Sequence, residues 1–505
     1  MRAQFSELPF LVILMGIGAA AMFLPAGHAL VISDHRTGRA FFYSGLLFLV
    51  LASFIAVATS NRASRNPGRS HLLALVAAYT ILPMMLAVPF HEAVRNTSFL
   101  NAYIEMVSSF TTTGATLYAP ERLAPSVHLW RAQVGWMGGF FVWVTAAAVL
   151  APLNLGGFEV RSRGGVGQGA AVPSQISRVA DMGERLRRYA GQLLPIYAGL
   201  TVVLWAALVI QGDVPLVALC HAMSTLATSG ISPVGGLEGA GSGASGEALI
   251  LLFLVFALSR VTFAREERPD GWRSLPRDSE LRMAFGIIAA VTVLLFMRHW
   301  VGAFERADER DVVSGVEAFW GGLFTAASFL TTTGFVSVNW EVARVWSGLE
   351  APGLILLGLA IFGGGVGTTA GGVKLLRVYA LYIHGSREID RLIHPSSVGG
   401  AGPVARQLRR QGAPLAWIFF MLFAFSIAIA MAAFSLAGLG FEEATVLAIA
   451  ALSTTGPLVE VAGGDALRLD LLPDAAKIVF LAAMVIGRLE TLALIALLNP
   501  DFWRG

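Results

Sequence analysis

Four short clusters of hydroxyl residues and glycine recur along the chain, and their oxygen atoms could replace the water shell of a monovalent cation. The clusters are Thr112-Thr113-Gly114, Thr228-Ser229-Gly230, Thr332-Thr333-Gly334 and Thr454-Thr455-Gly456. Their glycines recur at long and similar intervals, and such recurrence indicates internal repeats. No acidic side chain lies in any cluster. Selection would therefore depend on neutral oxygens, which suits a monovalent ion better than a strongly hydrated divalent one.

The segment before each cluster is apolar but too short to cross a bilayer, and it lies between two longer apolar runs. Each repeat therefore predicts a span, a short helix, a loop and a second span. Non-helical backbone at membrane depth is tolerated only where it is buried in protein or lines a watery cavity. Four loops meeting on one axis satisfy this condition. Their carbonyls can then face the ion, and the residue just before each glycine adds a carbonyl and could add a hydroxyl.

Glycine suits such a loop because it accepts positive φ, and each short helix would direct its partly negative C-terminal end at the axis. A plainer alternative is that each cluster is a helix end or a packing motif, since small residues crowd helix interfaces in membranes. One copy would favour that alternative. Four copies at matching places between paired spans favour a selectivity filter.

The composition places the chain among membrane proteins. Of its 505 residues, 55% are hydrophobic and 14% are charged, against about 25% charged in soluble domains. The single cysteine, Cys220, excludes an internal disulfide and a cysteine-based zinc site. Apolar runs of about 20 residues are long enough to cross a bilayer. The predicted spans lie near 8–32, 40–59, 71–90, 127–152, 190–211, 246–264, 283–301, 351–383, 413–438 and 476–498.

These patterns predict an all-α polytopic membrane protein, with two N-terminal helices and four pseudo-repeated helix–pore-loop–helix units around a central ion pore. The first apolar run is interpreted as a retained helix rather than a signal peptide, because it is long and a second run follows it. The predicted units are 1–70 for the two extra helices, 71–188 for repeat 1, 189–282 for repeat 2, 283–411 for repeat 3 and 412–505 for repeat 4.

Arginine is concentrated in the stretches 60–70, 153–188 and 373–412, which predicts that these loops are cytoplasmic. The stretches 302–313 and 457–475 are richer in acids, as outer loops are in this arrangement. With ten spans, both termini are then cytoplasmic.

The eighth predicted span is interrupted by a glycine-rich stretch, residues 363–374, named here the glycine loop. Such a stretch cannot form a stable helix, because each glycine costs about 1 kcal/mol against alanine. A dinucleotide-binding motif is excluded because its strand and βαβ unit are lacking. Close packing of glycine against a neighbouring helix and a mobile gate remain as alternatives. The candidate gate residues are Gly363, Gly364, Gly365, Gly367, Thr368, Thr369, Gly371, Gly372 and Lys374.

Arg488 lies inside the last predicted span, where a charge must face a watery cavity or a partner. A structural pair with Glu490, or extension of the side chain to the inner interface, is the plainer alternative. Glu105, Glu317, Glu442 and Glu443 lie on the short helices, where they could attract cations to the outer mouth or could only cap helices and face solvent. His221 has no second ligand at helical spacing, so a metal site there is disfavoured.

The chain resembles the superfamily of Trk, Ktr and HKT potassium transporters, and within it the TrkH-type membrane subunit. The resemblance covers essentially the whole chain. It is carried by Asn101 to Thr116 ending in TTTGAT, by Val316 to Trp340 around TTTGF, by Ile486-Gly487-Arg488-Leu489-Glu490 and by Asn499 to Arg504.

The resemblance implies K⁺ uptake across the bacterial inner membrane, with K⁺ bound at the filter only and with no cofactor in this chain. It also implies that the glycine loop closes the pore from below and that Arg488 lies beneath the filter. The implied partners are a second copy of the chain and a cytosolic, TrkA-like ring of nucleotide-binding regulatory proteins, with no nucleic acid. In this superfamily a serine in place of the first filter glycine accompanies Na⁺ permeability, so four glycines favour K⁺.

Two other functions stay open at this point. One is a carrier-type secondary transporter that moves K⁺ with H⁺ or Na⁺, although all four hairpins run the same way. The other is a less selective pathway for Na⁺ and K⁺. A membrane-embedded enzyme is disfavoured, because the sequence has no HExxH, no GxSxG and no pair of intramembrane aspartates.

Overall fold

The computed structural model describes residues 10–59, 67–150, 182–259, 278–302, 312–349, 351–394, 412–463 and 467–489. Within these ranges every regular element is a helix. The predicted all-α architecture is therefore confirmed. The arginine-rich loops lie largely outside the described ranges, as do both ends of the chain. The cytoplasmic placement of the termini and the boundaries of the predicted units accordingly stay predictions.

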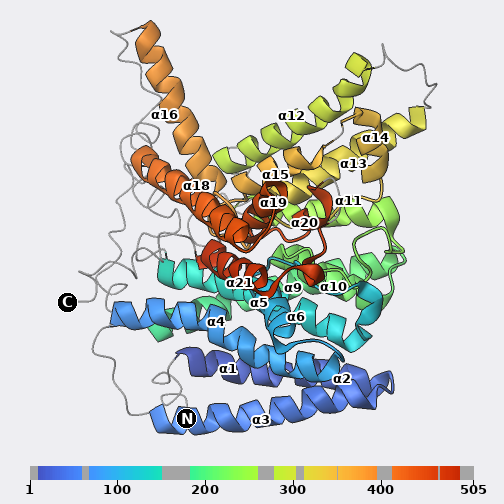
Figure 1. The fold of residues 1–505 in the computed structure, drawn as a ribbon, viewed down its shortest axis with the longest axis vertical. Coiled ribbons are helices and arrows are strands. Elements are labelled where there is room, and N and C mark those ends of the chain that lie inside the picture. The colour runs from blue at the N-terminus through green and yellow to red at the C-terminus, as the bar shows by residue number, and fades with distance from the viewer. Residues whose placement is uncertain are drawn as a thin grey trace.

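The first three helices form a layer at one edge of the molecule (Figure 1). They are α1 (Phe10–Ala21), α2 (Phe23–Val31) and α3 (His35–Thr59). This layer packs on repeat 1 through α4 and α6. Two hydrogen bonds fasten it to α6: Gln133 donates to the Ala21 carbonyl at 3.0 Å, and the His28 ring lies 2.8 Å from the Ser126 hydroxyl.

Each repeat contains a long first helix, a short helix and a second helix. The first helices are α4 (Pro67–Ala93), α9 (Met182–Ile210), α12 (Ser279–Gly302) and α18 (Ala413–Leu436). The short helices are α5 (Phe99–Phe110), α10 (Pro215–Ala227), α13 (Val312–Leu330) and α19 (Phe441–Leu452). The second helices are α6 (Pro125–Thr145), α11 (Gly243–Leu254), the pair α15 (Gly353–Phe362) and α16 (Leu375–Ile393), and α21 (Asp474–Leu489). Two small helices, α14 (Trp340–Ser347) and α20 (Leu458–Val461), follow the third and fourth clusters.

The repeats close into a ring. Within each repeat, the first helix packs against its own short helix. Between repeats, each second helix also packs against the short helix of the next repeat, in the pairs α6 with α10, α11 with α13, α15 with α19, and α21 with α5. Since the last pair joins repeat 4 back to repeat 1, the four short helices lie around one centre. Figure 1 shows them in the interior, with α16 projecting from the body.

Seven described helices are long and apolar enough to cross a membrane, and six of them match the two N-terminal spans and the four first helices. The seventh is within α13, which was expected to be too short to cross. Among the residues that the structure describes, none of the four second helices meets the same criterion. The described parts of α11, α15 and α21 are too short for it, and α11 and α15 are nevertheless apolar. The longer α6 buries the polar side chains of His128, Arg131 and Gln133. The glycine loop also divides α15 from α16.

Candidate ion pathway

The four clusters adopt the same unusual backbone at the ends of their short helices. They are named here loop 1 (111–115), loop 2 (227–231), loop 3 (331–335) and loop 4 (453–457). In every loop the first cluster residue is a threonine with a left-handed backbone: φ is +56° at Thr112, +50° at Thr228, +57° at Thr332 and +54° at Thr454. Such a backbone is strained for a β-branched residue, and strain of this kind gathers at functional sites.

One backbone donor of each loop is directed back into the short helix that precedes it. In all four loops the N–H of the second cluster residue donates to the carbonyl five residues earlier. The pairs are Thr113 to Ser108 at 2.8 Å, Ser229 to Ser224 at 3.0 Å, Thr333 to Ser328 at 2.9 Å and Thr455 to Ala450 at 2.9 Å. Because these donors are satisfied there, carbonyl oxygens are the main backbone groups that the loops can offer to an ion.

The four loops contact one another in cyclic order. Each cluster glycine is so close to the next loop that an added Cβ would press against it or collide with it. Gly114 meets Ser229 of loop 2, Gly230 meets Thr333 of loop 3, Gly334 meets Pro457 of loop 4, and Gly456 meets Ala115 of loop 1. The structure thus brings all four predicted clusters together around one axis, as the pore interpretation requires.

Loop 4 departs from the pattern of the other three. Gly114, Gly230 and Gly334 have positive φ, at +75°, +65° and +81°, whereas Gly456 does not. The Gly456 N–H instead donates to the Thr113 carbonyl at 2.6 Å. Loops 1 and 4 are therefore linked directly by a backbone hydrogen bond.

The hydroxyls just before the glycines are already engaged in hydrogen bonds within their own repeats, so their coordination of an ion stays a prediction. Each bonds to another hydroxyl of its own repeat: Thr113 to Thr111 at 2.8 Å, Ser229 to Ser224 at 3.1 Å, Thr333 to Thr331 at 3.0 Å, and Thr455 to Ser453 at 3.2 Å. A buried hydroxyl needs a partner, and a neighbouring hydroxyl is within reach. These side chains fix the shape of the loops.

The hydroxyls of three left-handed threonines, Thr228, Thr332 and Thr454, lie against the glycine loop. The Thr332 hydroxyl accepts a hydrogen bond from the Gly371 N–H at 2.7 Å. The Thr228 hydroxyl lies 3.2 Å from the Thr369 hydroxyl, and a Cβ on Gly371 would collide with Thr454 Oγ1. The middle of the glycine loop, residues 369–371, is named here its crest. The crest thus lies against loops 2, 3 and 4 at the base of the ring.

The glycine loop folds back on itself between α15 and α16. Gly363, Gly367 and Gly372 have positive φ, at +56°, +71° and +64°, which only glycine adopts without strain. The Val373 N–H donates to the Ile361 carbonyl at 2.8 Å, and this hydrogen bond joins the two ends of the loop. The predicted interruption of the eighth span is confirmed.

Two buried cations hold the crest of this loop. Arg488 donates from Nη2 to the Thr369 carbonyl at 2.7 Å, and Lys374 donates from Nζ to the Ala370 carbonyl. The side chains are only 8% and 6% exposed. Lys374 therefore turns inward, toward its own loop. Glu490, the alternative partner of Arg488, lies outside the described residues.

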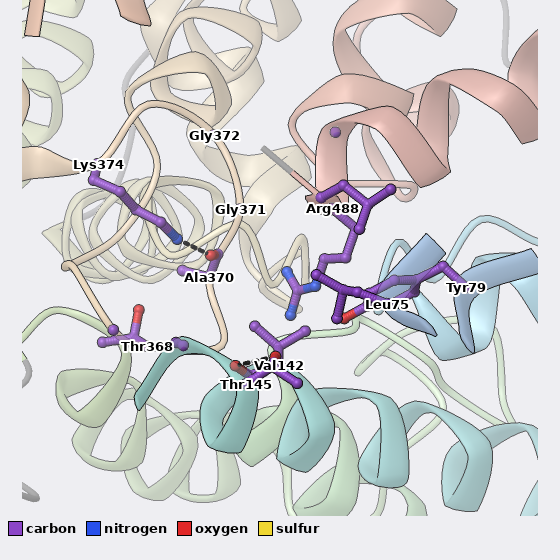
Figure 2. A pocket seen from close by; sticks show the side chains of 14 residues that line it. Leu75, Tyr79, Val142, Thr145, Thr368, Ala370, Gly371, Gly372, Lys374 and Arg488 are labelled. Atoms are coloured by element: carbon purple, nitrogen blue, oxygen red, sulfur yellow. Dashed lines mark hydrogen bonds between the residues drawn. The ribbon is translucent and has the colours of Figure 1, made fainter. Parts of the chain in front are cut away.

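A cavity of about 40 Å³ lies between the two cations and α4 and α6 (Figure 2). Figure 2 shows the Arg488 guanidinium pointing into it, near Tyr79, with Lys374 on the other side and Thr145 below. This volume holds a few water molecules. A cation there would also be repelled by both charges, each by about 2 kcal/mol at a separation of about 8 Å and an effective dielectric constant of about 20.

Repeat 2 and α12 hold the first part of the glycine loop, which follows α15. The Gly365 N–H donates to the Ala257 carbonyl at 3.0 Å, and the Val366 N–H donates to Glu280 Oε1 at 3.1 Å. Glu280 is fully buried. The sequence interpretation did not identify it; a carboxylate at the start of a membrane helix is the signal that points to such a role.

Two buried carboxylates brace the segments that follow loops 1 and 3. Glu105 accepts from the Leu117 N–H at 3.1 Å and pairs with Arg131 at 2.6 Å. Glu247 of α11 accepts from the Val338 N–H at 2.5 Å. Glu105 is buried, so it does not attract cations at an outer mouth, and Glu247 was not identified from the sequence.

The remaining candidates have ordinary structural places. Glu443 accepts from the Gly440 N–H at 3.1 Å and caps α19, whereas Glu317 lies half-buried on α13. The His221 ring is buried, 2.9 Å from the Ser232 hydroxyl. Among the described residues, no group of three or more His, Cys, Asp or Glu side chains is placed to hold a metal ion.

Comparison with known proteins gives concordant matches. The family model TrkH, a cation transport protein, matches residues 274–501. The Trk system potassium uptake protein TrkH of Salmonella typhimurium is 30% identical over 491 residues, which cover 96% of each chain. TrkG of Escherichia coli is 26% identical over 482 residues, 92% of each chain. The crystal structure of the potassium transporter TrkH from Vibrio parahaemolyticus superposes over 100% of both chains with a TM-score of 0.79 and 25% identity.

Proposed function

The chain belongs to the TrkH family of Trk potassium uptake proteins, and on that premise we propose that it carries K⁺ across the bacterial inner membrane through the ring of loops 1 to 4. The observation that supports this most directly is the cyclic contact of Gly114, Gly230, Gly334 and Gly456 with their neighbouring loops. Backbone carbonyls without any carboxylate make a site for a weakly hydrated monovalent ion. All four glycines are present, which favours K⁺ over Na⁺.

The glycine loop is proposed to be the gate. It touches the base of the ring through Thr332, Thr228 and Thr454, and its crest is held by Arg488 and Lys374. Its many glycines permit a second conformation, because they add little steric restriction to the backbone. In the observed position, the crest and the two charges obstruct a cation below the ring.

Transport through such a pore requires no chemical step in this chain, which is therefore proposed to be a transporter and not an enzyme, without a cofactor. The membrane potential alone supplies about 2.3 kcal/mol per 100 mV for each entering cation. A carrier that couples K⁺ to H⁺ or Na⁺ is the second candidate. The four repeats share one order of elements and close into a single ring around one centre. This arrangement favours the channel-like pathway over a carrier built from inverted repeats.

The proposed assembly is a homodimer on a cytosolic, nucleotide-binding regulatory ring, with both termini cytoplasmic. Such a regulatory ring would need to contact an element that is connected to the gate. The projecting helix α16 begins directly after the glycine loop, at Leu375, so a force on α16 would reach the loop.

The test is uptake of radioactive Rb⁺ into proteoliposomes that contain this chain alone, with K⁺ gradients and with Na⁺, Li⁺ and Cs⁺ as competitors. We expect uptake that rises with the gradient and is inhibited by K⁺ more strongly than by Na⁺ or Li⁺. Protein-free liposomes are the control. Absence of uptake by folded protein would contradict the transport function. Saturating uptake with obligatory H⁺ or Na⁺ movement would favour the carrier, and equal inhibition by Na⁺ and K⁺ would favour the less selective pathway.

A further inference from the structure

Pro457 occupies a place at the outer end of the ring that no other loop fills. A Cβ on Gly230 would lie 2.7 Å from Cγ of Pro457, and a Cβ on Gly334 would lie 2.9 Å from the same atom. The pyrrolidine ring of loop 4 is therefore in contact with the glycines of loops 2 and 3. Pro457 is also partly exposed, so it lies where the ring of loops opens toward solvent.

The corresponding residues of the other three loops are buried in the protein. Ala115, Ile231 and Phe335 are only 4%, 2% and 2% exposed. The Ala115 carbonyl accepts from the Ser108 hydroxyl at 2.6 Å, and the Phe335 ring packs edge-on against His221. Three loops thus direct the residue after their glycine into the protein, and only loop 4 directs it across the ring.

The backbone of loop 4 explains this difference. Gly456 lacks the positive φ of its three counterparts, and Pro457 caps the small helix α20 with φ of −58°. This path brings the Gly456 N–H within 2.6 Å of the Thr113 carbonyl. An N–H pointing at that oxygen competes with a cation for it, whereas proline itself adds no donor.

We propose that Pro457 is a specificity-determining residue, whose rigid ring sets the width of the outer end of the filter. For a cation to reach the Thr113 carbonyl, loop 4 must then shift away from it. The size of the cation decides how far loop 4 must shift. Larger cations require a larger shift against the packing of Pro457 on Gly230 and Gly334, so the outer end discriminates by size. This inference depends on the proposed function of the ring as the ion pathway.

The test compares Rb⁺ and Cs⁺ influx into proteoliposomes for the wild-type chain, Pro457→Ala and Pro457→Gly. Removing the pyrrolidine ring of Pro457 should raise the Cs⁺/Rb⁺ flux ratio about fivefold in Pro457→Ala, a change in the barrier of about 1 kcal/mol. The ratio should rise at least as much in Pro457→Gly. The matched control is Pro473→Ala, which removes an exposed proline before α21 and should keep the wild-type ratio. Folding is checked by size-exclusion chromatography and thermal unfolding in detergent.

An unchanged Cs⁺/Rb⁺ ratio in folded Pro457→Ala would overturn the inference, as would an equal change in the flux of both ions. The wild-type chain gives a second measurement that needs no variant: it should pass Cs⁺ more slowly than Rb⁺, and equal rates would also overturn the inference. Failure of the proposed function is distinguishable, because then the wild-type chain would pass neither ion.

Discussion

At the scale of single residues, the site depends on groups that have no room for substitution. Gly114 has φ of +75°, and a Cβ there would collide with the Ser229 carbonyl of the next loop. A side chain at this point must shift loop 2 or distort loop 1. Either movement displaces carbonyls whose spacing decides between K⁺ and Na⁺.

Gly114→Ser is therefore expected to lower the K⁺/Na⁺ permeability ratio several-fold. Forcing a residue with a side chain into this backbone costs about 1 to 3 kcal/mol, which is enough to change the loop. Competition of Na⁺ with Rb⁺ uptake measures the ratio. Gly286→Ser is the matched control, because nothing lies within 4 Å of a Cβ at Gly286 in α12. A wild-type ratio in folded Gly114→Ser would place the selecting carbonyls elsewhere.

Arg488 combines two effects on the closed pathway, since it holds the Thr369 carbonyl and repels cations beneath the ring. Arg488→Ala removes both, and we expect Rb⁺ flux to rise about tenfold, for a barrier lower by about 1.4 kcal/mol. The control is Arg468→Ala, which removes an exposed arginine paired with Asp470. Lower flux in a folded Arg488→Ala protein would show that the arginine has only a structural role.

At the scale of elements, the gate hypothesis becomes specific where the glycine loop meets the first-position threonines. Thr332 accepts the Gly371 N–H, whereas the Thr112 hydroxyl is buried without a hydrogen-bond partner among the described residues. Two threonines at equivalent places in the ring thus differ in one contact with the loop.

Thr332→Val keeps the branched shape and removes the acceptor of Gly371. A hydrogen bond of this kind contributes about 1 kcal/mol net, so the population with the loop displaced should rise about fivefold. We expect a matching rise in basal Rb⁺ flux. Thr112→Val removes an equivalent hydroxyl without breaking a contact to the loop, and it should leave basal flux nearly unchanged. Equal effects of the two variants would mean that the hydroxyls act on the ion and not on the gate.

Sequence patterns predicted the elements that are local in the chain and missed those that depend on distant contacts. The four clusters, the short helices before them and the interruption at 363–374 follow from composition within a few residues. The direction of the Thr113 hydroxyl does not, because it depends on left-handed backbone at Thr112. Nor does the place of Pro457, which is decided by contacts with loops 2 and 3.

At the scale of the whole molecule, the ring is a structure in which one repeat supports the next. Glu247 belongs to repeat 2, yet its carboxylate accepts from Val338 of repeat 3. The same carboxylate accepts from the Ser337 hydroxyl at 2.8 Å and from the Trp320 indole N–H at 2.7 Å. Because Glu247 and Val338 are far apart in the sequence, local sequence patterns do not predict this hydrogen bond. A carboxylate that is 1% exposed with three donors on it fixes the segment after loop 3 relative to α11.

Glu247→Gln tests this coupling between repeats. The amide has one carbonyl oxygen in place of two carboxylate oxygens, so at least one of the three donors loses its acceptor, and hydrogen bonds to a charged group contribute about 1.5 to 3 kcal/mol each. We expect a lower midpoint of thermal unfolding in detergent and a lower K⁺/Na⁺ ratio. Glu238→Gln, at an exposed position of the same repeat, should change neither. Adding Ser337→Ala should cost less in Glu247→Gln than in the wild type, because interacting residues are non-additive. Additive effects would show that the carboxylate does not hold loop 3, and that each repeat keeps its own loop in place.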